Sequence, residues 1–220
     1  MIHTTKDKLK KIFKKASEED IDAFYKVFSS KAEAFGVKTE VQENFFLAQI
    51  VAETGYDLKP KRENLNYSVS ALKSIFKRYR NNPKWAERDG YIKRGREYIQ
   101  KANKVNIGNI AYANRIGNGD INSGDGYRFR GGGYFQLTGR ENYEKMTEVI
   151  NKVLGKHLTP ELLEAEINTI EVSTLTALAF WYTNKCYECD HIDCVTKKIN
   201  RYTDSYEKRK EIYMWIAGLA

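Results

Sequence analysis

A run of apolar residues that ends in a carboxylate constrains this chain more than any other feature. Residues 45–52 are almost all apolar, and the next residue is Glu53. At helical spacing their side chains cover nearly the whole circumference, which indicates a buried helix. Thr39 followed by Gln42 is typical of a capping box, and Gly55 suits the position just past a helix end. The sequence therefore predicts a core helix that starts at Thr39, stops at Gly55 and carries Glu53 in its last turn.

Glu53 is predicted to lie where ionisation is unfavourable. Apolar surroundings and the negative end of a helix dipole both oppose a charged carboxylate, so we expect Glu53 to hold a proton and act as a general acid. Glu63 lies in the polar segment 61–67, which has no helical periodicity, and we expect it on a loop, hydrated and ionised. Two carboxylates in contrasting environments are the arrangement that separates an acid from a base. Because the chain has 29 acidic residues, the pair needs support from other motifs.

Three motifs together resemble a known family. They are Ala48-Gln49 to Glu53-Thr54-Gly55, the segment Glu63-Asn64-Leu65-Asn66-Tyr67, and the Gly-rich block from Gly131 to Tyr143. From about Leu9 to its C-terminus the chain resembles the family 19 chitinases and, more closely, their bacteriophage endolysin relatives. The resemblance implies a mainly α, two-lobed, lysozyme-like domain with a small β-sheet bordering the cleft. It also implies hydrolysis of β-1,4 bonds between N-acetylated sugars.

The resemblance implies roles for single residues. Glu53 would donate a proton to the leaving oxygen, and Glu63, helped by Thr138, would activate a water on the opposite face of the sugar, which inverts the anomeric centre. Arg209 would support the catalytic carboxylates. An amide can both donate to and accept from an N-acetyl group, and a hydroxyl can hold a water. The implied substrate-binding residues are Tyr67, Gln136, Asn142 and Asn200.

One departure from the family concerns Asn200. The family has Ile-Asn-Gly-Gly at this point, whereas this chain has Ile199-Asn200 followed by Arg201 and Tyr202. Since two glycines are replaced, the backbone that presents Asn200 is expected to differ from that of the family.

Hydrophobic spacing predicts a helical chain around one small sheet. The Gly-rich segment from Gly117 to Gly133 is predicted as turns, and two short strands are predicted at Tyr127–Arg130 and Tyr134–Thr138. We predict one domain over residues 1–220, with no separate wall-binding module. Five other helices are predicted before residue 170: a short one built on Leu9, Ile12, Phe13 and Ala16, one from Ser17 to Gly36, one from about Ser70 to Asn81, one interrupted by Gly95 with Trp85, Tyr91, Ile92, Tyr98 and Ile99 as core residues, and one starting near Pro160. A further helix is predicted through Leu175–Tyr182, and the resemblance to the family implies one at Ile192–Arg201.

The net charge of +8 favours polyanionic partners: nucleic acid, anionic lipid surfaces or the acidic polymers of a bacterial wall. Lys and Arg are scattered between acidic residues, and the chain has no DNA-binding signature, so we expect no nucleic-acid partner. The expected partner is the peptidoglycan glycan strand. We expect the protein to bind it as a monomer and to need no cofactor.

Three cysteines and a histidine lie close together: Cys186, Cys189, His191 and Cys194. An odd cysteine count without a signal peptide favours reduced thiols over a disulfide framework. The alternative is a zinc clip, but zinc sites usually separate their two ligand pairs by a longer loop. We therefore predict no metal site.

The segment Met1–Lys8 lacks the apolar core of a signal peptide, and no run is long enough to span a bilayer. We expect a protein that stays in the cytoplasm of a host bacterium and reaches the cell wall through a separate membrane-lesion protein.

These observations predict a phage-type endolysin that cuts the glycan strands of peptidoglycan. A chitinase is the alternative within the same chemistry, because chitin shares the N-acetylglucosamine unit. A catalytically inactive wall-binding protein is an alternative of a different class. The presence of both carboxylates together with Gln136 and Thr138 favours an enzyme.

Overall fold

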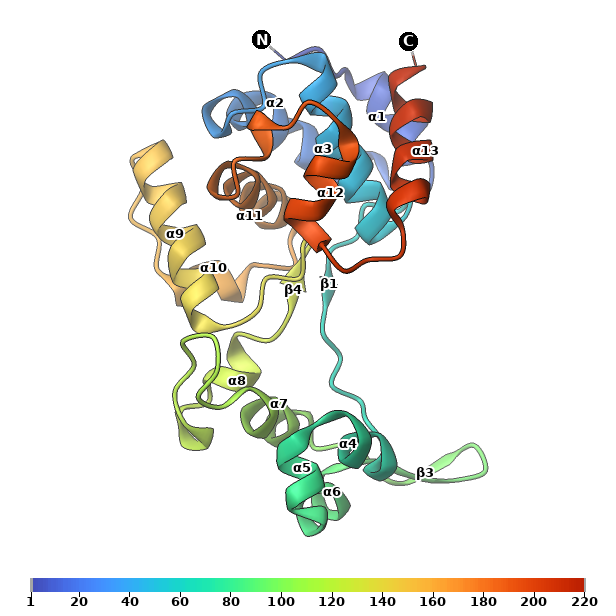
Figure 1. Cartoon of the computed structure of the whole chain (residues 1–220), viewed down its shortest axis with the longest axis vertical. Coiled ribbons are helices and arrows are strands. Elements are labelled where there is room, and N and C mark those ends of the chain that lie inside the picture. The colour runs from blue at the N-terminus through green and yellow to red at the C-terminus, as the bar shows by residue number, and fades with distance from the viewer. Residues whose placement is uncertain (1, 220) are drawn as a thin grey trace. The chain divides into compact units, whose positions relative to one another are not determined.

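The computed structural model describes residues 2–219. The protein is mainly α-helical, as predicted, and divides into two compact units (Figure 1). Unit 1 consists of Met1–Lys61, Gly132–Gln136 and Lys145–Ala220, and unit 2 of Arg62–Gly131 and Leu137–Glu144.

Unit 1 contains most of the helices. Its elements are α1 (Lys6–Ile12), α2 (Glu18–Lys31), the 3-10 helix η1 (Ala32–Phe35), α3 (Glu40–Thr54), β4 (Gly132–Gly133), the larger part of α9 (Arg140–Leu154), α10 (Pro160–Ala165), α11 (Ile170–Thr183), η3 (Cys186–Glu188), α12 (Ile192–Asn200) and α13 (Tyr206–Ala217). Strand β1 (Lys61–Arg62) pairs with β4. Its first residue, Lys61, is the last residue of the first segment of unit 1.

Unit 2 is built from short elements. They are α4 (Val69–Ile75), α5 (Lys77–Asn81), α6 (Pro83–Asp89), β2 (Ile92–Arg94), β3 (Glu97–Gln100), α7 (Lys104–Tyr112), η2 (Ile121–Ser123), α8 (Asp125–Arg128) and the first turn of α9.

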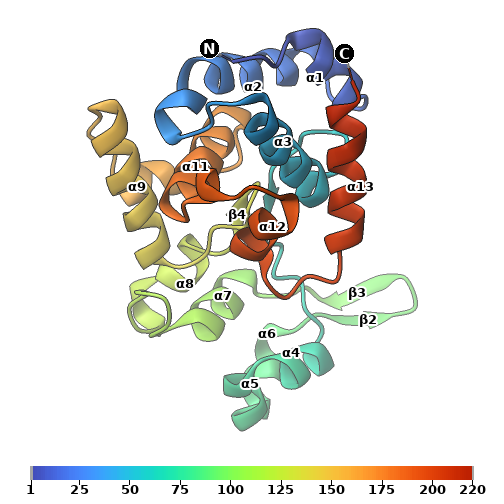
Figure 2. The same ribbon diagram turned by 45° about the horizontal axis from the view of Figure 1, so that its top comes forward.

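The predicted core helix is α3. Thr39 and Gln42 form the capping box, and Gly55 follows the helix at φ 82°. The ring of Phe46 packs against the rings of Phe28, Phe135 and Trp181, and α13 lies beside α3 (Figures 1 and 2). The chain therefore wraps unit 1 around a helix that is buried on most sides, as its composition requires.

Helix starts and stops elsewhere in unit 1 also agree with the sequence. Ser17 caps α2, and Gly36 ends η1 in the left-handed conformation. Thr159 caps α10, which has Pro160 in its first turn, and α11 and α12 lie in their predicted segments.

The core of unit 2 is a separate apolar cluster. Buried Leu65, Leu72, Tyr79 and Ile107 form its centre, and partly buried aromatic rings pack against it. The hydroxyl of Tyr79 donates to Asp89 Oδ2 at 3.0 Å, and Asp89 also accepts from Arg88 and Asn106. The fully buried Asp89 therefore accepts hydrogen bonds on both of its oxygens, as a buried carboxylate must.

The helix predicted through Trp85 and Ile99 is wrong in its second half. Helix α6 ends at Asp89, and β2 and β3 form an antiparallel hairpin with Gly95 at φ 60° in the turn. Tyr98 and Ile99, expected in the core, are 43% and 59% exposed. Their spacing fits both a helix and a strand, and the glycine decided for the hairpin.

Two other predicted boundaries need correction. The helix expected over about 70–81 is broken at Phe76, whose extended backbone separates α4 from α5. The strand expected at Tyr127–Arg130 is wrong, because α8 occupies Asp125–Arg128. The strand expected at Tyr134–Thr138 is wrong as well, because residues 134–136 form a turn; β4, at Gly132–Gly133, lies just before it. A Cβ on Gly126 would lie 2.3 Å from the carbonyl oxygen of Gly108, so α8 lies directly against α7.

The cysteine prediction is also wrong. Cys189 and Cys194 form a disulfide that joins the end of η3 to the first turn of α12. Cys186 keeps a buried thiol, and burial raises its pKa to about 12. Because two of the four supposed ligands are bonded to each other, the zinc clip does not form. Within residues 2–219 no group of three His, Cys, Asp or Glu side chains is placed to hold a metal ion.

The Asp125–Arg140 ion pair makes unit 2 sensitive to acid. Arg140 donates to both oxygens of Asp125 at 2.9 and 2.7 Å, and this hydrogen bonding holds the pKa of the buried carboxyl below its usual value. A depressed folded-state pKa stabilises the protein above the unfolded-state value, about 3.9, and the contribution disappears as pH falls through the folded-state value.

We therefore predict that Asp125→Asn lowers the free energy of unfolding at pH 7 by about 1.5–3 kcal/mol, the range for hydrogen bonds to charged groups. The difference from the wild type should shrink below about pH 4. Urea unfolding at several pH values measures it, with Asp120→Asn as control, because an asparagine at this position keeps the acceptor that caps η2. A difference that is constant from pH 7 to pH 2 would contradict the assignment.

Candidate active site

Glu53 lies in the last turn of α3, as predicted, and makes an ion pair. Its Oε1 accepts from Arg209 Nη2 at 2.6 Å; the Glu53 side chain is 20% exposed and that of Arg209 is 3% exposed. The contact implied between Arg209 and a carboxylate is therefore present. The purely apolar surroundings expected for Glu53 are wrong, because a buried cation lies against one of its oxygens.

Arg209 is itself held by two further side chains. Its Nη1 donates to Gln49 Oε1, and its Nε donates to Ser205 Oγ at 2.9 Å. Gln49 in turn donates through Nε2 to Thr196 Oγ1 at 2.9 Å, and both residues are fully buried. Since Gln49 is on α3, Thr196 on α12 and Arg209 on α13, the network ties three helices together behind Glu53.

Gln49 and Thr196 were not predicted as parts of the site, although Gln49 belongs to one of the three motifs. The available signal was Gln49 itself, a polar residue in the middle of a helix that is apolar nearly all round. A buried amide needs hydrogen-bond partners, so its presence indicates a polar network in the core.

Gln136, a predicted substrate-binding residue, lies at the edge of unit 1. Its Nε2 donates to the carbonyl oxygens of Lys61 and Gly133 at 2.9 and 3.2 Å, and its backbone has φ 48°. A left-handed conformation at a residue other than glycine is uncommon, and this structure also has it at Leu58, Leu65 and Lys185. Lys61 also donates from Nζ to the Glu53 carbonyl oxygen at 3.2 Å. Lys61 therefore contacts both Gln136 and the last turn of α3.

Glu63 lies on a loop after β1, as predicted, and is held within unit 2. Its Oε1 accepts from the Tyr112 hydroxyl at 2.8 Å, and its Oε2 accepts from the Gly131 backbone N–H at 3.3 Å. The main chain is fixed as well, because Glu63 N donates to the Gly131 carbonyl at 2.8 Å and Arg130 Nε donates to the Glu63 carbonyl. The Gly-rich block thus orients Glu63 through its backbone.

Two tyrosines flank Glu63. Burial, followed by the negative charge of Glu63, raises the pKa of both Tyr112 and Tyr67 above the ordinary value for a phenol. Both hydroxyls therefore stay protonated at neutral pH, and that of Tyr112 donates to Glu63. Tyr67 was predicted to bind substrate, whereas Tyr112 was missed; it lies at the end of α7, far from the recognised motifs in sequence.

The remaining predicted residues divide between the units. Thr138 and Asn142 lie together at the start of α9 in unit 2, where Asn142 Nδ2 donates to the Thr138 carbonyl at 2.8 Å. Asn200 is exposed at the last residue of α12, four residues after Thr196. Unit 1 therefore carries Glu53, Gln136, Asn200 and Arg209, and unit 2 carries Glu63, Tyr67, Thr138 and Asn142.

Comparison with known proteins decides the family. No family model matches the chain. It is 34% identical over 204 residues to a "Glycosyl hydrolase family 19 domain-containing protein" of Haemophilus influenzae, and the match covers 91% of each chain. This chain belongs to glycosyl hydrolase family 19. The resemblance to family 19 drawn from the three motifs is confirmed, and the chain is a glycoside hydrolase of the chitinase and lysozyme-like group. No helix within residues 2–219 is long and apolar enough to cross a membrane.

We predict that Gln49→Leu lowers the free energy of unfolding of this family 19 chain by about 1.5–3 kcal/mol, because it removes a buried acceptor from the Arg209 guanidinium. Thr196→Val removes only a neutral partner from the other end of Gln49, so its loss should be near 1 kcal/mol. Urea unfolding of both variants measures the two values. A larger loss for Thr196→Val than for Gln49→Leu would contradict this account of the network.

Proposed function

We propose that this glycoside hydrolase cuts β-1,4 bonds in the glycan strands of bacterial peptidoglycan, by an inverting mechanism with two carboxylates. The observation that carries the proposal is that each of the two expected carboxylates is held by its own hydrogen-bond network: Glu53 by Arg209, and Glu63 by Tyr112 and the Gly131 amide.

In the proposed reaction Glu53 is the general acid. Arg209 engages Oε1, so Oε2 is the oxygen that delivers the proton to the leaving glycosidic oxygen. Glu63 is the general base and, with Thr138, activates the attacking water. An inverting enzyme keeps the two carboxyl groups roughly 6.5–9.5 Å apart to admit this water.

Other residues have binding roles in this proposal. Gln136, Asn142 and Asn200 offer amides to the N-acetyl groups, and Tyr67 offers a phenol donor beside Glu63. Arg201 and Tyr202 replace the two glycines that follow Asn200 in the family, so Asn200 contributes from a changed backbone.

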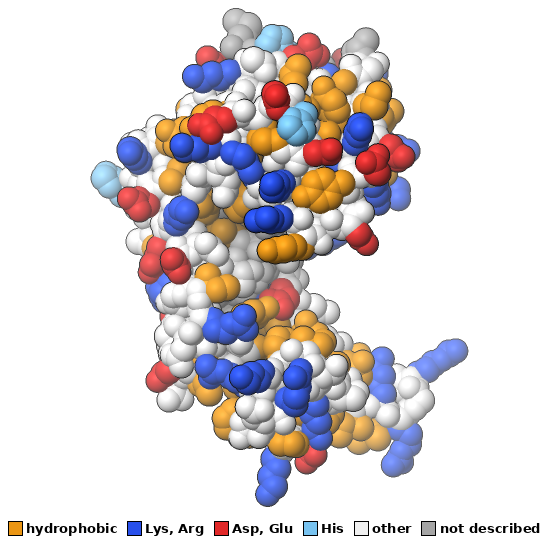
Figure 3. All heavy atoms as spheres, viewed as in Figure 1, with side chains coloured by type: hydrophobic (Ala, Val, Ile, Leu, Met, Phe, Trp, Pro, Cys, Tyr) orange, Lys and Arg blue, Asp and Glu red, His pale blue; other side chains and the backbone are white. Residues whose placement is uncertain are grey.

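The charge distribution supports peptidoglycan over chitin. Of 37 Lys and Arg and 29 Asp and Glu, unit 2 carries 16 and 8, which leaves 21 of each sign in unit 1. The whole excess of +8 therefore lies on the unit that holds Glu63, and Figure 3 shows Lys and Arg spread over the face of unit 2 in view. Peptidoglycan bears carboxylates and chitin is neutral, so the acidic polymer gains more from this charge.

The biological role that we propose is that of a phage-type endolysin acting as a monomer. It accumulates in the cytoplasm of the host bacterium, reaches the wall through a lesion made by a separate membrane protein, and lyses the cell.

The proposal predicts that Glu53→Gln and Glu63→Gln each lower kcat by about 10²–10⁴-fold, the usual contribution of a general acid or base. Thr138→Ala should have a smaller effect, because Thr138 positions water without transferring the proton. Loss of turbidity of permeabilised Gram-negative cells and release of reducing sugar from colloidal chitin measure the two candidate activities.

Glu97→Gln, which removes an exposed carboxylate from the β2–β3 hairpin, is the control and should keep wild-type activity. Substantial activity in Glu53→Gln would defeat the acid assignment. Reducing sugar from chitin without any loss of turbidity would favour the chitinase alternative.

A further inference from the structure

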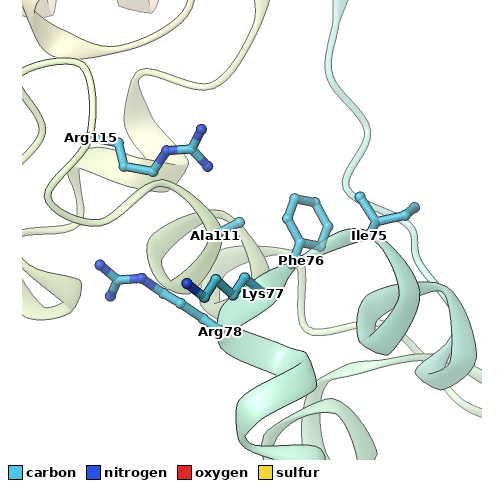
Figure 4. Close-up of a pocket in the computed structure, with 6 residues that line it drawn as sticks. All are labelled: Ile75, Phe76, Lys77, Arg78, Ala111 and Arg115. Atoms are coloured by element: carbon cyan, nitrogen blue, oxygen red, sulfur yellow. The ribbon is translucent and has the colours of Figure 1, made fainter.

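Unit 2 has an open pocket whose polar lining is entirely cationic. It has a volume of about 350 Å³ and is formed by the end of α4, the start of α5 and the last turn of α7 with the segment after it (Figure 4). Ile75, Phe76 and Ala111 supply the apolar surface, and Lys77, Arg78 and Arg115 supply the charge. Lys77 and Arg78 come from α5, and Arg115 comes from the segment after α7.

The hydrogen bond that Arg78 makes to a backbone carbonyl does not neutralise the positive charge of the pocket. Arg78 donates from Nη2 to the Ala113 carbonyl at 2.9 Å, which fixes the guanidinium against the end of α7 but leaves its charge in place, since a carbonyl is neutral. Lys77 and Arg115 are exposed at the rim. None of the six lining residues is acidic, so the pocket suits an anionic group with an apolar part.

Both walls of the pocket connect to Glu63 through a single residue. On one wall Phe76 packs edge-on against Tyr67, with ring centroids 5.2 Å apart, and the charge of Glu63 acts on Tyr67. On the other wall Tyr112, between Ala111 and Ala113, donates its hydroxyl to Glu63 Oε1. Tyr67 and Tyr112 therefore connect the pocket to the carboxylate expected to activate water, and all of these residues belong to unit 2.

We propose that this pocket binds a carboxylate on a substituent of the glycan chain and thereby selects acidic glycans over neutral ones. The inference rests on the proposed function, since it names the substrate feature that the same active site recognises. Arg115 and Arg78 present planar forks that match a carboxylate, and Lys77 adds a point charge. Ile75, Phe76 and Ala111 contact the aliphatic part of the substituent. In peptidoglycan the carboxylate comes from the lactyl ether or from the peptide attached to it; chitin has neither.

The test compares two variants that lose the same charge. Lys77→Gln/Arg115→Gln removes the two exposed cations of the pocket and leaves Arg78 in its structural contact. Arg94→Gln/Arg96→Gln removes two exposed cations from the β2–β3 hairpin and is the matched control. Three substrates are used: glycan strands with peptide stems, the same strands after an amidase has removed the stems, and neutral chitin oligosaccharides. Thermal unfolding checks that both variants fold.

The expected result is a KM for acidic strands about five- to tenfold higher in the pocket variant, with kcat unchanged; two partly exposed ion pairs supply an effect of this size. The control variant should match the wild type on all substrates, and the pocket variant should match it on chitin oligosaccharides. A change confined to stem-bearing strands assigns the pocket to a peptide carboxylate. A change confined to stripped strands assigns it to the lactyl carboxylate, which the amidase sets free, and a change on both kinds of strand shows that the pocket accepts either carboxylate.

Three results would overturn the inference. An unchanged KM in the pocket variant, or an equal rise in the control variant, would show that the pocket does not recognise the substrate. An equal loss on chitin oligosaccharides would show that the substitutions act on the catalytic residues. If the wild type cuts acidic strands, these results leave the proposed function intact. A wild type that cuts none of the three substrates would overturn both.

Discussion

A buried guanidinium is the constraint on which unit 1 depends. Removing a cation such as Arg209 from water costs several kcal/mol unless its donors are satisfied. Gln49, Glu53 and Ser205 satisfy them from α3 and from the start of α13, and Thr196 secures Gln49 from α12. The same contacts that make the buried charge tolerable therefore fix the direction of the Glu53 side chain. Folding of the core and positioning of the proposed acid therefore depend on the same hydrogen bonds.

Unit 2 positions its carboxylate by a different device. Glu63 lies on a loop without regular structure, and the backbone of Gly131 and the hydroxyl of Tyr112 define its place. The unit around it also carries all of the net positive charge of the chain. A carboxylate in such surroundings is held by donors on both oxygens while the surface attracts acidic polymers. Unit 1 thus has equal numbers of positively and negatively charged residues, and unit 2 has a net positive charge.

Local signals predicted most helices of this protein, and long-range contacts explain what the sequence did not reveal. Thr39, Gln42 and Gly55 determine the ends of α3 through contacts within a few residues, so its limits could be predicted. The spacing of Tyr98 and Ile99 fits both a helix and a strand, and the turn at Gly95 makes this segment a hairpin in which both side chains are exposed. The Cys189–Cys194 bond and the Gln49–Thr196 contact depend on how segments meet in space. Family resemblance supplied Arg209, which is 156 residues away from Glu53, and no local pattern supplied Tyr112.

The proposed mechanism depends on two carboxylates that act as acid and base on opposite faces of one sugar. The anomeric form of the first product tests this most directly. ¹H NMR of the reducing end, recorded within the first minutes of hydrolysis and before mutarotation, distinguishes the two forms. Direct attack by a water that Glu63 activates inverts the β bond, so the account predicts that the α-anomer appears first. Initial release of the β-anomer would indicate a covalent intermediate and would contradict the assignment of Glu63 as a base.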